Sequence, residues 1–215
     1  MSYKYEDFRH DYNEDEDWFD FEDELAFVHT LDGAFAGNTE YMRVLADIYS
    51  SDMHGVKRDY NKVIFWLYKL AECGNVYATI RLAGMYFEYD DKGVPHDYEK
   101  ALMLYEIAAK SGDERAVARL GIMYYYGFGC EKDLTLAREL FARAAEKDEP
   151  EACYYYARIL KTEGAKDWFD YLKKAADKSN GKAGWEIVSN YADAIPDNKF
   201  LMYLACAAGY DSFDY

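Results

Sequence analysis

Histidine side chains are the first groups in this chain to test for metal or acid–base chemistry. They stand far apart, at His10, His29, His54 and His96, and none belongs to an HExxH motif. His54 and His96 fall in equivalent glycine loops of an internal repeat, so a shared metal would require loops about one repeat apart to converge. Two separate, solvent-exposed loop histidines are the simpler interpretation.

Cysteine and carboxylate patterns give no stronger indication of a reactive site. The four cysteines form no CxxC motif and have no regular spacing. They are Cys73, Cys130, Cys153 and Cys206. We expect free thiols in a reducing compartment, which favours the cytoplasm. Acidic pairs such as Asp90-Asp91 lie in charge runs typical of a solvated face, and the sequence has no glycine-rich phosphate loop and no GxSxG motif. We therefore predict no enzyme, no metal and no cofactor.

An internal repeat sets the elements that would position any functional side chain. Each unit has a leucine, a small residue directly after it, and a tyrosine four positions after the leucine, as in Leu45-Ala46 and Tyr49. The leucines Leu45, Leu82 and Leu120 are 37 and 38 residues apart. Periods of this length are typical of helical solenoids, in which stacked units share one core.

Each unit is predicted to fold as a helix, a glycine loop, a second helix and a short turn. Ala78, Leu82 and Tyr86 are spaced by four residues, which places them on one face of a first helix. Each second helix is expected to begin at an aspartate that caps its free backbone N–H groups. These aspartates are Asp59, Asp97 and Asp133. Gly74 and Gly112 are predicted to end second helices in the left-handed conformation.

Two further units, around Tyr156-Ala157 and Ile187-Val188, follow the pattern less closely. In the first three units the aspartate stands twelve residues before a small residue near the end of the second helix, as Asp59 does before Ala71. From Asp167 to the small residue Ala176 the interval is only nine residues, and the last unit has the same shorter interval. This predicts, in both units, second helices that are shorter by about one turn or that begin with a tighter entry. Residues 26–37 indicate a leading half-repeat. We expect one capping helix and five helix pairs, about eleven helices in all.

The pattern resembles the Sel1-like repeat, a relative of the tetratricopeptide repeat. Residues 113–148 match best, through Leu120-Gly121, Gly127-Phe128-Gly129 and Asp133. The resemblance covers roughly residues 38–209 and is strong over three units and weak over the last two. Cys130 stands where the family has valine, and the paired-cysteine spacing of disulfide-rich members is missing. The resemblance implies an all-α, right-handed solenoid of stacked antiparallel helix pairs. It also implies an adaptor that binds other proteins.

The sequence predicts three segments. Residues 1–23 form an N-terminal arm whose composition differs from that of the predicted solenoid. The solenoid comprises residues 24–209, and residues 210–215 form a C-terminal tail. The first 24 residues hold eleven acids against Lys4 and Arg9, together with seven aromatic residues. A solvated, disordered arm would have this charge. An acidic, aromatic segment that docks on a basic partner or folds back on the solenoid would have it as well. Neither a targeting segment nor a membrane span is expected.

The net charge of −16 disfavours nucleic acid and anionic membranes as partners and favours a protein with a basic surface. The oligomeric state stays open. If the first helices line a concave face, the positions beside their core residues point at the partner. The candidate partner-binding residues are Arg43, Tyr77, Phe87, Tyr125, Tyr126, Tyr154, Arg158 and Trp185. Tyrosine, tryptophan and arginine dominate interface hot spots, although packing between repeats would use the same rings.

Three functions remain open from the sequence. The first is an adaptor or scaffold that binds a protein or peptide on this face. The second is an acidic, immunity-type inhibitor of a basic effector or toxin, which would use electrostatic steering followed by aromatic anchoring. The third is a structural scaffold that assembles with copies of itself through its end repeats.

Overall fold

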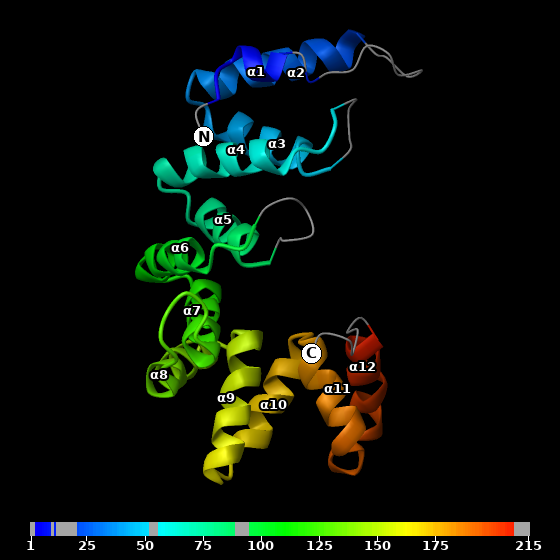
Figure 1. Cartoon of the computed structure of the whole chain (residues 1–215). Helices are drawn as coiled ribbons and strands as arrows, with labels where there is room; N and C mark the ends of the chain where they lie inside the picture. Colours follow the sequence, from blue (N-terminus) through cyan, green and yellow to red (C-terminus); the bar gives the residue numbers. More distant parts are fainter. Residues whose placement is uncertain (1–2, 10, 12–20, 52–55, 89–94, 209–215) are drawn as a thin grey trace. The chain divides into compact units, whose positions relative to one another are not determined.

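The computed structural model describes residues 3–9, 11, 21–51, 56–88 and 95–208, and the chain divides into two compact units, residues 1–108 and 109–215. The described residues form twelve α-helices and one short 3-10 helix (Figure 1). Consecutive helices pack as antiparallel pairs within each unit, so the predicted all-α fold of helix pairs is confirmed.

The first unit contains a short N-terminal helix, a capping helix and the first two helix pairs. Its helices are α1 (Glu6–Arg9), α2 (Phe21–Phe35), α3 (Thr39–Ile48), α4 (Tyr60–Glu72), α5 (Val76–Glu88) and α6 (Tyr98–Lys110), the last ending at the boundary between the units. In each pair the odd-numbered helix is the first helix of a repeat and the even-numbered helix is the second.

The second unit contains three helix pairs. They are α7 (Glu114–Tyr126), α8 (Leu134–Ala145), α9 (Pro150–Glu163), α10 (Trp168–Asp177), α11 (Gly181–Asn190) and α12 (Asp197–Ala208), with the 3-10 helix Ala192–Ala194 before α12. One capping helix and five pairs match the predicted count. The short helix α1 was not predicted.

The repeat aspartates begin the second helices as expected. Asp59 Oδ1 accepts from the backbone N–H groups of Asn61 and Lys62 at 2.9 and 3.3 Å. Asp133 caps α8 in the same way, and Asp97 accepts from the N–H of Lys100 at 3.0 Å. Each bond satisfies a donor that has no partner within its own helix. The repeat therefore marks its own helix starts.

Helix ends and lengths agree with the sequence in part. Gly74 and Gly112 have φ of +80° and +84°, which confirms the predicted left-handed caps. Helix α10 has ten residues where α4 and α6 have thirteen, so the predicted shortening is confirmed there. The shortened-helix alternative is wrong for α12, which has twelve residues because Asp197 itself is helical and the helix continues to Ala208.

The core of each unit is built from the repeat positions. Leu45 and Leu82 are fully buried in the first unit, as is Phe141 in the second. Packing explains why a glycine, Gly121, follows the core leucine of this repeat: a Cβ at this position would lie 2.7 Å from the Phe141 ring of α8. A residue without a side chain lets this ring pack directly on α7, and burying a phenylalanine stabilises the fold by about 1.5–3 kcal/mol.

The N-terminal arm is tied to the first unit where the structure describes it. Phe8 of α1 is fully buried, and Tyr5 donates a hydrogen bond to Asp32 of α2 over 2.6 Å. Where the structure describes them, residues 3–9 and 11 therefore contact the first unit. Helix α2 begins at Phe21, ahead of the boundary predicted at residue 24. Residues 12–20 and the predicted tail, residues 210–215, lie outside the described residues.

Candidate functional site

The first helices of the second unit, α7, α9 and α11, carry five of the eight predicted partner-binding residues. These helices are joined laterally by ion pairs. Arg119 of α7 contacts Glu151 of α9 at 3.1 Å, and Lys161 of α9 contacts Glu186 of α11 at 3.2 Å. We call the surface that these three helices share the first-helix face of the second unit.

Three consecutive tyrosines end α7 on this face. Gly127 closes the helix with a φ of +82° and donates its N–H to the Met123 carbonyl at 2.7 Å. Because successive residues turn by about 100°, the three rings separate. Tyr124 and Tyr125 are half-buried, whereas Tyr126 keeps 47% of its surface exposed.

The rings of Tyr125 and Tyr126 belong to a continuous aromatic cluster that runs from the core to the surface. Phe141 of α8 stacks on Tyr155 of α9 with ring centroids 5.2 Å apart and planes inclined by 11°. Tyr125 lies 5.7 Å from Tyr155, and Tyr126 lies 4.9 Å from Tyr125. Burial, and then the hydrogen bond with Tyr126, raise the pKa of Tyr155 above its usual range, so its hydroxyl stays neutral. Aromatic pairs of this kind add rigidity to a surface.

Cations border this cluster. The Arg158 guanidinium lies over the Tyr154 ring at 5.7 Å, with Nη1 3.5 Å from the tyrosine hydroxyl, and Lys132 Nζ lies 5.9 Å from the Tyr125 centroid. Within the described residues, no carboxylate pairs with Arg158. The guanidinium is therefore held by the ring and the hydroxyl of Tyr154, contacts that leave further guanidinium N–H groups to bind an acceptor.

The predicted residues of the second unit do not share one environment. Trp185 of α11 is 41% exposed and Arg158 is exposed as well. Tyr154 is only 8% exposed, so its ring supports Arg158 and is not itself open to a partner. Ala118 and Ile122 of α7 are buried as well. In the second unit α9 packs against α7, so these positions are covered.

Sequence reasoning missed a second ring cluster, which joins the start of α10 to the end of α11. Lys161 Nζ lies 5.0 Å from the Trp168 centroid and 5.2 Å from that of Tyr191. Phe169 also contacts Tyr191, at 5.5 Å. The sequence contains these rings in the motif Asp-Trp-Phe-Asp at residues 167–170. The motif has no repeat spacing that would predict a contact with Tyr191. Its first copy, residues 17–20, lies outside the described residues.

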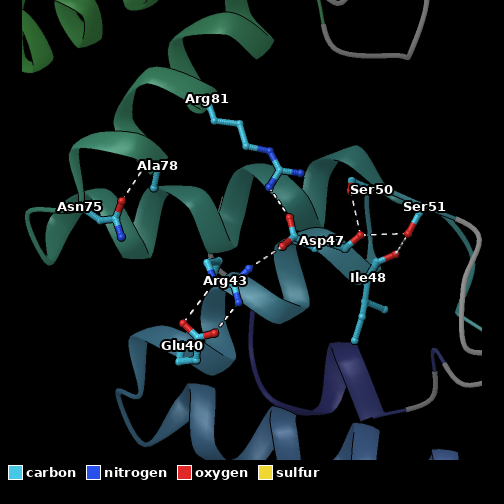
Figure 2. A network of polar contacts seen from close by, with 9 residues as sticks. All are labelled: Glu40, Arg43, Asp47, Ile48, Ser50, Ser51, Asn75, Ala78 and Arg81. Carbon is cyan, nitrogen blue, oxygen red and sulfur yellow. Dashed lines mark hydrogen bonds and ion pairs between the residues drawn. The ribbon is translucent and has the colours of Figure 1, made fainter. Parts of the chain in front are cut away.

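The corresponding face of the first unit is polar. Figure 2 shows Arg43 of α3 between Glu40 and Asp47, and Arg81 of α5 pointing at the same Asp47. The distances are 3.1 Å from Arg43 to Asp47 and 2.5 Å from Arg81 to Asp47. The Arg43 guanidinium also holds the pKa of Glu40 below its usual range. Two cations alternate with two carboxylates, so the predicted binding residue Arg43 already has partners.

The remaining two predicted residues lie on α5. Tyr77 is exposed at the start of the helix, and Phe87 is half-buried near its end. The Phe87 ring packs edge-on against Tyr98 of α6, with centroids 5.6 Å apart. Phe87 therefore packs within its own repeat. The structure brings Tyr125, Tyr126 and Arg158 close to one another in the second unit, as described above.

Side chains that bind metal ions do not gather in the part of the chain that the structure describes. No group of three or more histidine, cysteine, aspartate or glutamate side chains within the described ranges could hold a metal ion. The helices that the structure describes are also too short or too polar for any of them to cross a membrane. The exposed rings and the arginine can bind a partner by stacking, apolar contact and hydrogen bonding.

Comparison with known families finds one match. A family model described as the Sel1 repeat matches residues 40–75, 76–113, 115–149 and 169–180, which make up more than half of the chain. A search of curated proteins found no match.

Several solved structures share the fold. A protective antigen of uropathogenic Escherichia coli, which displays an SLR fold, is 24% identical with a TM-score of 0.65 over 87% of this chain and 41% of its own. A Sel1 repeat protein from Oxalobacter formigenes is also 24% identical with a TM-score of 0.65, over 86% of this chain and 80% of its own. An immunity protein from Pseudomonas aeruginosa is 16% identical with a TM-score of 0.54, over 86% and 73%. The chain thus spans less than half of the antigen.

Proposed function

Because the chain belongs to the Sel1 repeat family, we propose that it is a protein-binding module whose partner docks on the first-helix face of the second unit. Repeats of this family generally mediate protein interactions and are typically non-catalytic. The observation that carries the proposal is the cluster of Tyr125, Tyr126 and Arg158. It combines buried ring support, an exposed ring and a cation that no described carboxylate pairs with.

The first-helix face of the second unit has the physical features of an interface hot spot. Tyr126 and Trp185 offer large, rigid side chains with little conformational entropy to lose on binding. Arg158 offers directional donors held in place by the Tyr154 ring. Contacts of this kind dominate binding energy when a partner excludes water from them.

The net charge supports a partner whose surface is basic overall. A charge of −16 attracts a cationic protein over a Debye length of about 8–10 Å at ordinary salt. Electrostatic steering would raise the association rate, and the rings would slow dissociation. The cation Arg158 would then contact an acceptor within an otherwise basic partner surface.

Affinity capture from the source cell, followed by mass spectrometry and titration of the captured partner, tests the proposal. Tyr126→Ala and Trp185→Ala should each weaken binding by at least about tenfold. Tyr68→Ala is the matched control, because Tyr68 is comparably exposed but lies on α4, a second helix of the first unit. Equal affinities for wild type, Tyr126→Ala and Trp185→Ala would overturn the proposed site.

A finer form of the proposal is an immunity-type inhibitor of a basic effector. The strong negative charge supports it, as does the occurrence of the same fold in an immunity protein. Co-expression with a basic toxin encoded beside the chain should restore growth. Loss of that protection in Tyr126→Ala, with Tyr68→Ala still protective, would tie inhibition to the same face.

Self-assembly is a second candidate, which the outer face of α12 favours. Leu201 is 70% exposed, and Met202 and Leu204 are also exposed, although terminal repeats generally present a polar outer face. Light scattering across protein concentration tests this function. A dimer that Leu201→Lys converts to a monomer would support it, and a monomer at every concentration would exclude it.

A further inference from the structure

A buried lysine links the N-terminal arm to the repeats. Lys62 of α4 is only 7% exposed, and its Nζ donates to the Asp7 carbonyl at 2.9 Å and to the Asp11 carboxylate. Both acceptors therefore belong to the arm, residues 3–11. Tyr49 donates a second hydrogen bond to Asp11 over 2.6 Å. A buried cation without partners is costly, so the body of the first unit is built to hold a carboxylate here.

The same place holds an aromatic ring. Phe8 is fully buried and lies 5.3 Å from Trp66, 5.4 Å from Phe65, 5.7 Å from Phe35 and 5.9 Å from Tyr49, between ring centroids. Lys62 Nζ lies 5.0 Å from the Phe8 centroid, so one cation contacts both the ring and the carboxylate. We call the receiving residues the arm pocket. They are Phe35, Tyr49, Lys62, Phe65 and Trp66.

The next repeat shows what the arm adds. Lys100 occupies the same repeat position as Lys62, and each lies over the repeat tyrosine, at 5.2 Å from Tyr86 and 5.5 Å from Tyr49. Lys100 is exposed and pairs with Asp97, three residues before it, at 2.5 Å. Lys62 pairs instead with a carboxylate from outside its repeat. A lysine that lies over the repeat tyrosine thus occurs in both repeats. In the first repeat this lysine also binds the N-terminal arm.

We propose that the arm pocket is a peptide-binding site that selects an aromatic residue followed three positions later by a carboxylate. The arm, with Phe8 and Asp11, is its built-in competitor. The ligand is an acidic, aromatic segment of a partner protein. This proposal is independent of the first-helix face of the second unit.

Three observations indicate that the arm is replaceable. Helix α1 has four residues, far fewer than an isolated helix needs to be stable, so docking depends on the pocket contacts. Phe35 remains partly exposed with the arm in place. The Trp66 Nε1–H group is buried and has no acceptor among the described residues, so a ligand that supplies one would bind better than the arm does.

Attachment to the same chain makes the arm a strong competitor. A tethered segment acts at an effective concentration on the order of millimolar. A free peptide with the same sequence should therefore bind wild type poorly and bind a chain with a weakened arm well. This difference shows that the arm pocket accepts the segment from a separate molecule and that the arm competes for it.

The experiment measures the fluorescence anisotropy of a labelled peptide with the sequence of residues 3–11, titrated with full-length protein. The Phe8→Ala protein should bind it at least about tenfold more tightly than wild type does. Asp11→Asn provides a second weakened arm if circular dichroism shows that Phe8→Ala does not fold. A peptide carrying Phe8→Ala should not bind either variant.

Two lysine substitutions complete the test. Lys62→Met in the Phe8→Ala background should abolish binding, whereas Lys100→Met at the equivalent, exposed position should leave it unchanged. Equal, weak binding to wild type and to a folded weakened-arm variant would overturn the proposal. A wild-type dimer that the peptide dissociates would place the arm of a second copy in the pocket and would also contradict it.

Discussion

Arg81 of α5 donates a hydrogen bond from Nη1 to the Asp47 carboxylate of α3 over 2.5 Å and so connects the first helices of two consecutive repeats. Arg119 occupies the same repeat position, one residue before the core leucine, but pairs with Glu151 of the following first helix. An arginine at one repeat position can therefore bind a neighbour on either side, depending on where a carboxylate is supplied.

Removing the Arg81 guanidinium should cost stability through the lost connection between repeats. Arg81→Met should lower the free energy of unfolding by about 1 kcal/mol, the upper range for a pair that is partly exposed. Lys69→Met is the control, since its i,i+3 pair with Glu72 lies on one exposed helix turn and should be worth only about 0.3 kcal/mol. Urea denaturation of both variants measures the difference, and equal losses would contradict the lateral role of Arg81.

Two helical glycines at neighbouring repeat positions should respond oppositely to alanine. A Cβ on Gly84 would make an ordinary contact, 3.7 Å from the Tyr105 hydroxyl, so Gly84→Ala should stabilise the protein by about 0.5–1 kcal/mol through helix propensity. Gly121→Ala would place its Cβ 2.7 Å from Phe141 and should destabilise it by about 1–3 kcal/mol. Thermal unfolding of the two variants measures both effects. If both substitutions stabilise the protein, the Phe141 ring can move away from the added Cβ at no cost.

A half-buried helix cap gives the stability of the protein a defined pH dependence. Glu149 caps α9 by accepting from the Ala152 N–H at 2.6 Å, and burial raises the pKa of its carboxyl above the ordinary value of 4.5. With the folded pKa raised, the stabilisation is fully present below the unfolded pKa and is lost as pH rises through the folded pKa. Glu149→Gln keeps the accepting oxygen and cannot ionise, so it should be the more stable protein at pH 7.

Melting temperatures of wild type and Glu149→Gln, measured between about pH 4 and pH 8, test this sign. The advantage of Glu149→Gln should shrink toward the acidic end, where the wild-type carboxyl is protonated. If the difference in melting temperature between Glu149→Gln and wild type were constant across this pH range, ionisation of Glu149 would not contribute to it.

The four thiols should react in an order set by burial. Cys73 is exposed, whereas Cys153 is fully buried and its burial raises the pKa of the thiol to about 11. Because the thiolate is the reactive form, iodoacetamide at about pH 8 should modify Cys73 first and Cys153 last. Peptide mass spectrometry follows the reaction, with denatured protein as the control in which all four react. Equal rates for Cys73 and Cys153 in the native protein would contradict this burial.

The repeat positions could be read from the sequence because their contacts are local. Ala78 and Leu82 are buried on one face of their own helix, and Asp59 and Asp133 bond to N–H groups two and three residues away. Spacing alone specifies such contacts. The same spacing could not specify exposure. Tyr154 was predicted to face a partner, but burial of that position depends on neighbouring elements that spacing does not describe.

Docking of the arm could not be predicted in the same way. Phe8 and Asp11 lie in an acidic segment without helical periodicity, and the residues that receive them, such as Lys62 and Trp66, lie more than fifty positions later. In the sequence, Lys62 and Lys100 are equivalent. Only the structure distinguishes the lysine that binds its own aspartate from the lysine that binds the arm.

The separation between Phe8 and its receiving residues also fixes an order of events on the ribosome. The aromatic segment is synthesised first, and α4, which carries Lys62 and Trp66, is completed only after more than fifty further residues. At a translation rate on the order of 5–20 residues per second, the segment waits for several seconds before its binding place exists. The eleven acids among the first 24 residues supply the charge that keeps exposed rings in solution during this interval. The acidity of the arm thus serves the nascent chain as well as the folded protein.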